Sequence, residues 1–178
     1  MKRKIKIKPR FWVILAVFII VVTSLFVGCE KEEEIPKTSA CVETEGETKD
    51  YILNIPLSCD LQEELYKAAE EFGVDYYIMI ALIERETQFR NSIGDGGKSF
   101  GYCQIQPQWW YGLMSDIGAT DLKNPKDNFR TACAIIAQLT EKHQSIEGAL
   151  VEYNQGHYYG RPTAYSKDIM ENAERYRA

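Results

Sequence analysis

Two acidic side chains near the middle of the chain, Glu84 and Glu86, are candidates for proton transfer. Ile78 and Leu82 recur at a helical interval, and the pattern predicts a helix over residues 76–89. Positions two apart on a helix point in nearly opposite directions. Glu86 therefore extends the apolar face of this helix, whereas Glu84 points away from it.

The predicted surroundings of Glu86 are those of a general acid. Its helix is followed by a glycine-rich segment over residues 91–106, so Glu86 lies at the edge of the apolar face. Loss of hydration there raises the pKa of a carboxyl group, as a general acid working near neutral pH requires. The structural alternative is a glutamate at a helix end, paired with Arg85 or Arg90.

The elements that must position Glu86 are mostly helical. Asp60 and Glu63 have capping-box spacing, and Asn124 followed by Pro125 is typical of a helix start. The predicted fold class is α+β, mostly α, with a small irregular or β segment. Helices are expected at residues 60–72, 76–89, 108–116, 125–143, 145–153 and 163–176, with a loop or short β-hairpin at 91–106.

Three segments, in order along the chain, resemble the motifs of soluble lytic transglycosylase (SLT) domains. They are ALIERETQF at residues 81–89, GYCQIQP at 101–107 and EYNQG at 152–156. The resemblance covers about residues 60–178. It implies a lysozyme-like fold and cleavage of the MurNAc–GlcNAc bond of peptidoglycan, with Glu86 at the position of the catalytic glutamate.

The resemblance also implies a set of substrate-binding residues. Thr87 stands where serine is usual, and Cys103 replaces a methionine that lines the sugar cleft in the family. Independently, Trp109, Trp110 and Tyr165 offer either flat faces for sugar rings or core packing. The residues expected to bind substrate are Thr87, Asp95, Cys103, Gln104, Tyr153, Asn154 and Tyr165.

Two reactions and one non-catalytic function remain open. In a transglycosylase, Glu86 protonates the glycosidic oxygen and then acts as base while the muramoyl C6 hydroxyl attacks, giving a 1,6-anhydro product. The loop around Asp95 is also similar to that of goose-type lysozymes, in which an aspartate is associated with the attacking water. Asp95 would then make the enzyme a hydrolase. The third alternative is a module that binds glycan strands without cutting them.

No metal or cofactor is expected. The spacing of Cys29, Cys41, Cys59, Cys103 and Cys133 matches no zinc pattern, and the chain has no His-Glu-x-x-His motif. Cys133 lies in an apolar helical run and is interpreted as a core residue. The disulfide pairing of the four cysteines after Cys29 is left open.

The N-terminal segment predicts attachment to a membrane. Residues 1–10 are basic and residues 11–28 are uncharged and apolar, about the length needed to span a bilayer. The positive-inside rule then places the rest of the chain outside the cytoplasm. Residues 1–28 are either a retained anchor helix or a signal peptide that ends before a lipidated Cys29. We favour the lipoprotein.

The remaining boundaries follow from composition. Residues 29–58 are rich in Glu, Lys, Thr and Ser and predict a disordered linker, and residues 59–178 form the folded domain. The net charge is -5, and the body is acidic, which disfavours nucleic-acid binding. The expected partners are peptidoglycan glycan strands and the membrane, and we expect a monomer.

Overall fold

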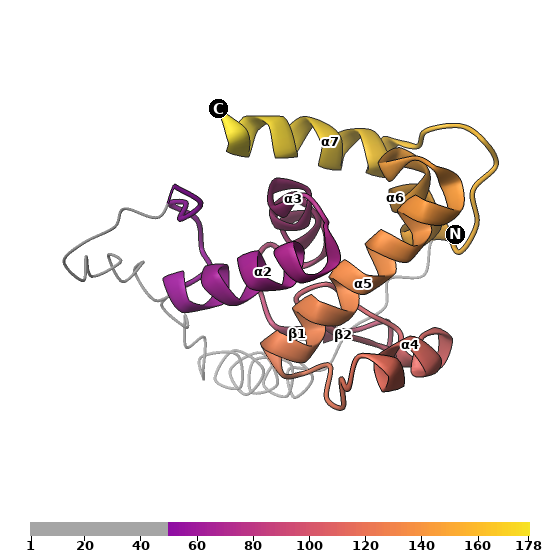
Figure 1. The fold of residues 1–178 in the computed structure, drawn as a ribbon, viewed down its shortest axis with the longest axis horizontal. Coiled ribbons are helices and arrows are strands. Elements are labelled where there is room, and N and C mark those ends of the chain that lie inside the picture. The colour runs from indigo at the N-terminus through magenta and orange to yellow at the C-terminus, as the bar shows by residue number, and fades with distance from the viewer. Residues whose placement is uncertain (1–49) are drawn as a thin grey trace, which may run out of the picture. The chain divides into compact units, whose positions relative to one another are not determined.

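The computed structural model describes residues 50–178 (Figure 1). The segment 1–28, Cys29 and the linker up to residue 49 lie outside the described residues. Among the described helices, none is both long and apolar enough to cross a bilayer. In chain order, the elements are α2 (Cys59–Phe72), α3 (Tyr76–Thr87), β1 (Ser92–Gly94), β2 (Ser99–Gly101), η1 (Pro107–Trp109), α4 (Tyr111–Asp116), α5 (Pro125–His143), α6 (Ile146–Gln155) and α7 (Ala164–Arg177).

The first two helices begin at side-chain caps. The Ser58 hydroxyl accepts from the backbone N–H of Leu61, so α2 starts one residue before the start predicted from Asp60. Gly73 ends α2 in the left-handed region with φ 64°. Asp75 caps α3 as a side-chain acceptor.

Helix α3 is the most deeply buried element. Every residue from Ile78 to Ile83 is buried, so α3 is covered on all sides rather than on one face. It packs against α7, while α5 packs against both α2 and α6. Figure 1 shows α3 near the centre, between α7 on one side and the pair α2 and α5 on the other. Burial of this helix fixes the backbone that carries Glu86.

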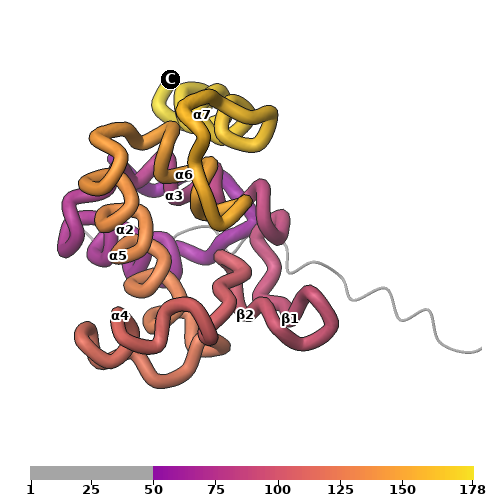
Figure 2. The backbone as a smooth tube through the Cα atoms, turned by 90° about the vertical axis from the view of Figure 1, so that its right-hand side faces the viewer, coloured from indigo at the N-terminus to yellow at the C-terminus, as the bar shows by residue number. Residues whose placement is uncertain are grey.

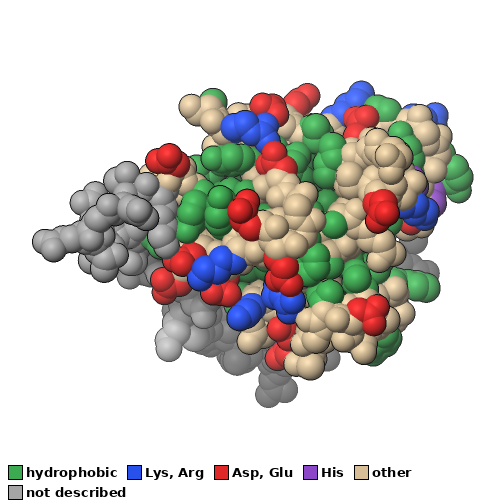
Figure 3. Space-filling model, in the orientation of Figure 1, with side chains coloured by type: hydrophobic (Ala, Val, Ile, Leu, Met, Phe, Trp, Pro, Cys, Tyr) green, Lys and Arg blue, Asp and Glu red, His purple; other side chains and the backbone are tan. Residues whose placement is uncertain are grey.

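The outer surface carries mixed charge. On the face shown in Figure 3, Lys and Arg side chains are interspersed with Asp and Glu. Among the ion pairs of the described residues, Arg130 on α5 binds Glu71 on α2 with an N–O distance of 2.6 Å. Exposed pairs of this kind each contribute about 0–1 kcal/mol to stability.

The glycine-rich segment forms the small β element. Strands β1 and β2 are antiparallel, with Ile93 opposite Phe100, so the hairpin alternative for residues 91–106 is confirmed. The predicted mostly helical α+β class is confirmed as well. Figure 2 shows this hairpin on one side of the helical body, with α7 on the opposite side in that view.

A buried amide, Asn128 on α5, attaches the hairpin to the helices. Its Nδ2 donates to the carbonyl oxygens of Phe100 (2.9 Å) and Leu122 (3.1 Å), and its Oδ1 accepts from the N–H of Cys103 (2.9 Å). A Cβ added at Gly101 would lie 2.2 Å from Nδ2, so only glycine fits there. The hairpin is thus held at a fixed place relative to α5.

Several predicted helices have different bounds in the structure, among them those over 76–89 and 108–116. The helix predicted over 76–89 stops at Thr87, because Gln88 and Phe89 have φ values of 51° and 61°. Two consecutive left-handed residues cannot continue a right-handed helix. The helix predicted over 108–116 is split into η1 and α4 at Trp110.

Residues 50–58 belong to the packed domain, so the prediction of a disordered linker through residue 58 is wrong for this part. Ile55 and Leu57 are buried in the core. The buried side chain of Gln62 donates to the carbonyl oxygens of Leu53 (3.0 Å) and Leu57 (2.8 Å). Leu53, Ile55 and Leu57 pack against the core, and the Gln62 amide on α2 binds the backbone of this segment. The folded domain therefore begins before the helix that the sequence predicts as its start.

Candidate active site

A cleft of about 700 Å³ contains Glu86. It is formed by the C-terminal end of α3, the β1–β2 hairpin, the turn that contains η1, and the C-terminal half of α6. Segments distant in sequence therefore meet at this cleft. Its lining residues are Glu86, Gly94, Asp95, Ser99, Gln104, Ile105, Gln106, Trp109, Trp110, Ile135, Glu152, Tyr153, Asn154, Gln155 and Gly156.

Glu86 is partly buried and is held by a neutral donor. The Tyr165 hydroxyl on α7 donates to Glu86 Oε1 at 2.5 Å. Burial raises the pKa of the Glu86 carboxyl, and the nearby charge of Asp95 acts in the same direction. The Tyr165 hydrogen bond and the charge of Arg85 oppose that rise without cancelling it. Glu86 therefore keeps its proton at a higher pH than an ordinary glutamate.

Tyr165 acts on Glu86 rather than offering a face to the cleft. It is only 8% exposed and is not among the residues that line the cleft. Burial raises the pKa of its phenol well above the ordinary value, so the hydroxyl stays protonated and remains a donor. The expectation that Tyr165 binds a sugar ring is not met by this placement, because α7 turns the ring into the core.

Asp95 lies in the hairpin turn, in the same cleft as Glu86. It is exposed, and its backbone has φ 49°. The buried hydroxyl of Ser99 donates to Asp95 Oδ2, and Gln106 Nε2 donates to the same oxygen at 3.2 Å. Two donors on one oxygen fix the orientation of the carboxylate and leave Oδ1 for another partner.

Gln104 lines the cleft and also braces the hairpin. Its Nε2 donates to the carbonyl oxygens of Gly101 (2.9 Å) and Ser92 (3.1 Å). A Cβ added at Gly94 would lie 2.1 Å from Gln104 Oε1, so the glycine makes room for this amide. The donors of Gln104 are used within the protein, and its carbonyl oxygen faces Gly94.

Tyr153 and Asn154 both line the cleft from α6. The Tyr153 hydroxyl donates to the carbonyl oxygen of Cys103 at 2.6 Å, which ties α6 to the turn after β2. Asn154 is exposed, so its amide is accessible to a bound molecule. These two positions match the placement expected from the sequence.

Cys103 and Thr87 do not line the cleft. Cys103 is wholly buried, and its contribution is through the backbone groups that bind Asn128 and Tyr153. The Thr87 hydroxyl lies 2.9 Å from the carbonyl oxygen of Tyr102 and 3.2 Å from that of Ile83. Both predicted substrate contacts are therefore corrected to structural roles that join α3, α5 and α6 to the turn.

The three described cysteines differ in state. Cys59 is disulfide-bonded. Cys103 and Cys133 are free and buried. Burial raises the thiol pKa of both residues, so neither is poised as a thiolate nucleophile. Within residues 50–178, no three His, Cys, Asp or Glu side chains cluster in a way that suits a metal ion.

Sequence reasoning missed several residues of the cleft. Ser99 and Gln106 orient Asp95, but a serine and a glutamine near glycines give no distinctive signal. Glu152 lines the cleft with its carboxylate bound by Lys142 (2.8 Å) and His143 (2.5 Å). A pairing between the end of α5 and the middle of α6 is visible only once the two helices are packed.

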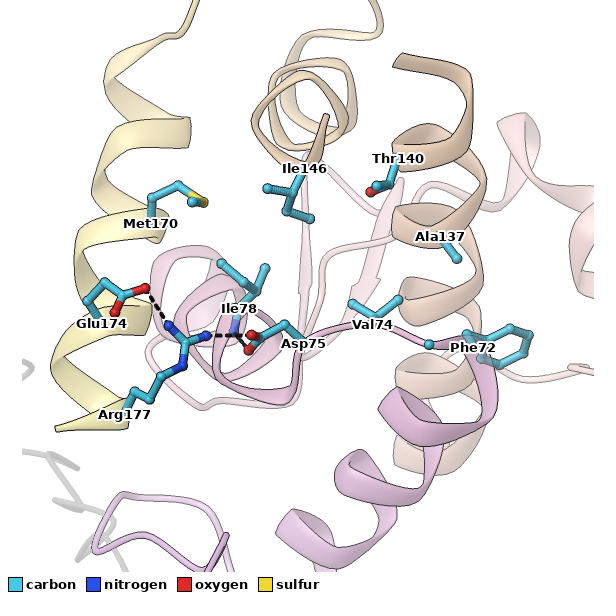
Figure 4. Close-up of a pocket in the computed structure, with 11 residues that line it drawn as sticks. Phe72, Val74, Asp75, Ile78, Ala137, Thr140, Ile146, Met170, Glu174 and Arg177 are labelled. Atoms are coloured by element: carbon cyan, nitrogen blue, oxygen red, sulfur yellow. Dashed lines mark hydrogen bonds and ion pairs between the residues drawn. The ribbon is translucent and has the colours of Figure 1, made fainter. Parts of the chain in front are cut away.

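A second cavity of about 350 Å³ lies where the ends of α2, α3, α5, α6 and α7 meet (Figure 4). Apolar side chains such as Phe72, Ile78 and Met170 form most of its wall. At its rim, Arg177 bridges Asp75 and Glu174. It shares no lining residue with the cleft.

Comparison with protein families gives a match over most of the described domain. The family model described as "Transglycosylase SLT domain" matches residues 64–171, which is more than half of the chain. The matched segment runs from α2 into α7 and contains Glu86, Asp95 and the lining residues of α6.

Proposed function

Because the chain belongs to the transglycosylase SLT domain family, we propose that it cleaves the β-1,4 bond between MurNAc and GlcNAc in peptidoglycan, with Glu86 as general acid. The family supports peptidoglycan transglycosylase chemistry in general. The observation that carries the specific proposal is the state of Glu86, which is partly buried, bound by a neutral hydroxyl and open to a cleft.

In the proposed first step, protonated Glu86 gives its proton to the glycosidic oxygen. The bond to the muramoyl anomeric carbon breaks through an oxocarbenium-like state, and GlcNAc leaves with the proton. In the second step, the carboxylate takes the proton of the muramoyl C6 hydroxyl while that oxygen attacks the anomeric carbon. The products are a 1,6-anhydro-muramoyl end and a regenerated acid, without a second catalytic carboxylate.

Tyr165 supports both steps as a positioning residue. Its hydroxyl fixes one oxygen of Glu86, at 2.5 Å, and leaves the other oxygen for the substrate. The same hydrogen bond stabilises the carboxylate that forms after proton donation. Asn154, which is exposed and lines the same cleft from α6, is suited to bind the N-acetyl group of a bound sugar.

The second candidate reaction is hydrolysis, favoured by the placement of Asp95. Its carboxylate is exposed in the same cleft and oriented by Ser99 and Gln106, with Oδ1 available to hold a water molecule. An inverting glycosidase uses such a second carboxylate to activate water on the far face of the sugar.

Mass spectrometry of digested sacculi distinguishes the two reactions. Anhydro-muropeptides, each lighter by one water than the hydrolytic product, are expected for the transglycosylase. Reducing ends would show hydrolysis, and Asp95→Asn should then abolish the activity. If the transglycosylase proposal is right, Asp95→Asn should still give only anhydro products.

We also propose that the domain acts outside the cytoplasmic membrane as a lipoprotein attached through Cys29. The support is the sequence of the N-terminal segment, a basic stretch followed by an apolar run. Mass spectrometry of the mature N-terminus tests this proposal. A lipid-modified Cys29 is expected, and a mature chain that retains residues 1–28 would overturn it in favour of an anchor helix.

A further inference from the structure

Trp109 exposes a large apolar surface inside the cleft. Trp109 lines the cleft, and 74% of the residue is exposed to solvent. Tryptophan side chains are usually largely buried, so this exposure is unusual. Its neighbour Trp110 is partly buried and packs against the core cluster. Of two adjacent tryptophans, one therefore anchors the turn and the other is presented to solvent.

The backbone around Trp109 is built to hold this presentation. Pro107 is the first residue of η1 and fixes its entry, and the N–H of Trp110 donates to the Pro107 carbonyl oxygen at 3.0 Å. The N–H of Met114 donates to the Trp110 carbonyl oxygen at 2.8 Å, which joins this turn to α4. The side chain of Trp109 projects from a short, anchored turn.

The indole of Trp109 is also oriented by a hydrogen bond. Its Nε1 donates to Gln106 Oε1 at 3.3 Å, and Gln108 Nε2 donates to the same oxygen at 2.8 Å. The Nε2 of Gln106 donates to Asp95 Oδ2 and to Ser99 Oγ, both at 3.2 Å. Gln106 thus joins the indole to the carboxylate that shares the cleft with Glu86.

We propose that Trp109 is a stacking platform for an N-acetylhexosamine ring of the glycan strand, and that it contributes to affinity on the Asp95 side of the cleft. This inference rests on the proposed function, because it assigns the ligand of the same cleft. The indole Nε1 is used within the protein, so the ring face is what Trp109 offers. An aromatic face suits the C–H face of a pyranose, whose hydroxyl groups then reach polar groups such as Asp95.

A second exposed aromatic provides a matched control. Tyr159 is 76% exposed, close to the 74% of Trp109, but it does not line the cleft. Its ring instead contacts the ring of His157, at a centroid distance of 4.2 Å. Removal of either side chain deletes a similar exposed surface. Only Trp109 should affect the binding of a glycan.

The test measures binding in the absence of cleavage. Full-length Glu86→Gln protein is titrated calorimetrically with the hexamer of β-1,4-linked N-acetylglucosamine, and Trp109→Ala, Trp109→Phe and Tyr159→Ala are each added to that background. Trp109→Ala should raise Kd about 5- to 10-fold, as expected for the loss of one aromatic contact. Trp109→Phe should stay within about twofold, and Tyr159→Ala should equal the background.

Two outcomes would overturn the proposal that Trp109 is a stacking platform. One is an unchanged Kd in Trp109→Ala, and the other is an equal loss of affinity in Tyr159→Ala. Circular dichroism of each variant checks that the fold is kept. If alanine unfolds the turn, Trp109→Leu, which keeps an apolar side chain without a ring face, replaces it and should show the same loss of affinity. Failure of the catalytic assignment would be seen separately, as cleavage of sacculi by the Glu86→Gln background itself.

Discussion

The cleft and the second cavity, called the helix-end cavity from here on, both contain carboxylates, but Glu86 in the cleft and the carboxylates of the cavity have opposite surroundings. In the cleft, Glu86 is partly buried and its hydrogen-bond partner is the neutral hydroxyl of Tyr165. In the helix-end cavity, Asp75 and Glu174 are more exposed and share the guanidinium of Arg177. One region keeps a carboxyl group ready to give up a proton, and the other neutralises its carboxylates with a fixed cation.

The difference between the two regions indicates which features of a cavity suggest a catalytic site. Apolar walls and a few polar groups are common to both regions. The cleft alone combines a carboxyl of raised pKa, a second oriented carboxylate and an exposed indole. The proposed catalysis therefore belongs to the cleft, and we regard the ion pairs of the helix-end cavity as part of the packing between α3 and α7.

The largest expected effect is on turnover. Glu86→Gln should lower the rate of muropeptide release from sacculi by about 10³-fold or more, because the amide has no proton to donate. The control is Glu84→Gln on the same helix, because the Glu84 carboxylate does not line the cleft and forms an ion pair with Arg175 at 3.0 Å. Wild-type turnover in Glu86→Gln, or an equal loss in Glu84→Gln, would contradict the proposal that Glu86 is the proton donor.

The next effect concerns the neutral donor. Tyr165→Phe should reduce kcat/KM about tenfold through loss of positioning. The Tyr165 hydrogen bond lowers the pKa of Glu86, so its removal should move the alkaline limb of the kcat/KM profile to higher pH. Tyr176→Phe, next to Glu84, should leave the profile unchanged. A limb that moves to lower pH in Tyr165→Phe contradicts the assigned role.

A smaller effect is expected on stability as a function of pH. The folded protein holds the Glu86 proton more tightly than the unfolded chain does, because burial raises the folded pKa. The resulting stabilisation is complete below the unfolded pKa and is lost as the pH rises through the folded pKa. Glu86→Gln escapes this loss. Its Tm should be a few degrees above wild type at neutral pH and equal to it near pH 3, by calorimetry. A lower Tm at neutral pH would contradict the proposed desolvation.

The smallest effect is expected in the helix-end cavity. Arg177→Ala breaks ion pairs between partly exposed side chains, so the free energy of unfolding should fall by less than about 1 kcal/mol. Muropeptide release should equal that of the wild type. Denaturant unfolding and the sacculus assay check the two parts, and a clear loss of turnover would show that this cavity takes part in catalysis.

The local patterns of the sequence predict the helices and the acid well. The Asn124 side chain caps α5 by accepting from the N–H of Lys126, and Pro125 is the first residue of that helix. Ser145 caps α6. Both helix starts agree with the local preferences of the sequence. The inward direction of Glu86 follows from helical periodicity alone. The family match over residues 64–171 supports the lysozyme-like class inferred from three short motifs.

Contacts between distant segments account for what the sequence does not predict. Nothing local marks Asn128 as the residue that holds both the hairpin and the loop at Leu122. Nor does local sequence separate Trp109, which is exposed, from Trp110, which is packed. Tyr165 has the residue type expected for sugar stacking, but the packing of α7 on α3 turns its hydroxyl toward Glu86.

The early end of α3 has an electrostatic consequence for Glu86. Since the helix stops at Thr87, the acid lies in the last turn, where the aligned carbonyl dipoles give the helix terminus a partial negative charge. That charge disfavours a carboxylate. The same glutamate in the first turn would have been held ionised, so the direction of α3 works together with burial to keep the proton on Glu86.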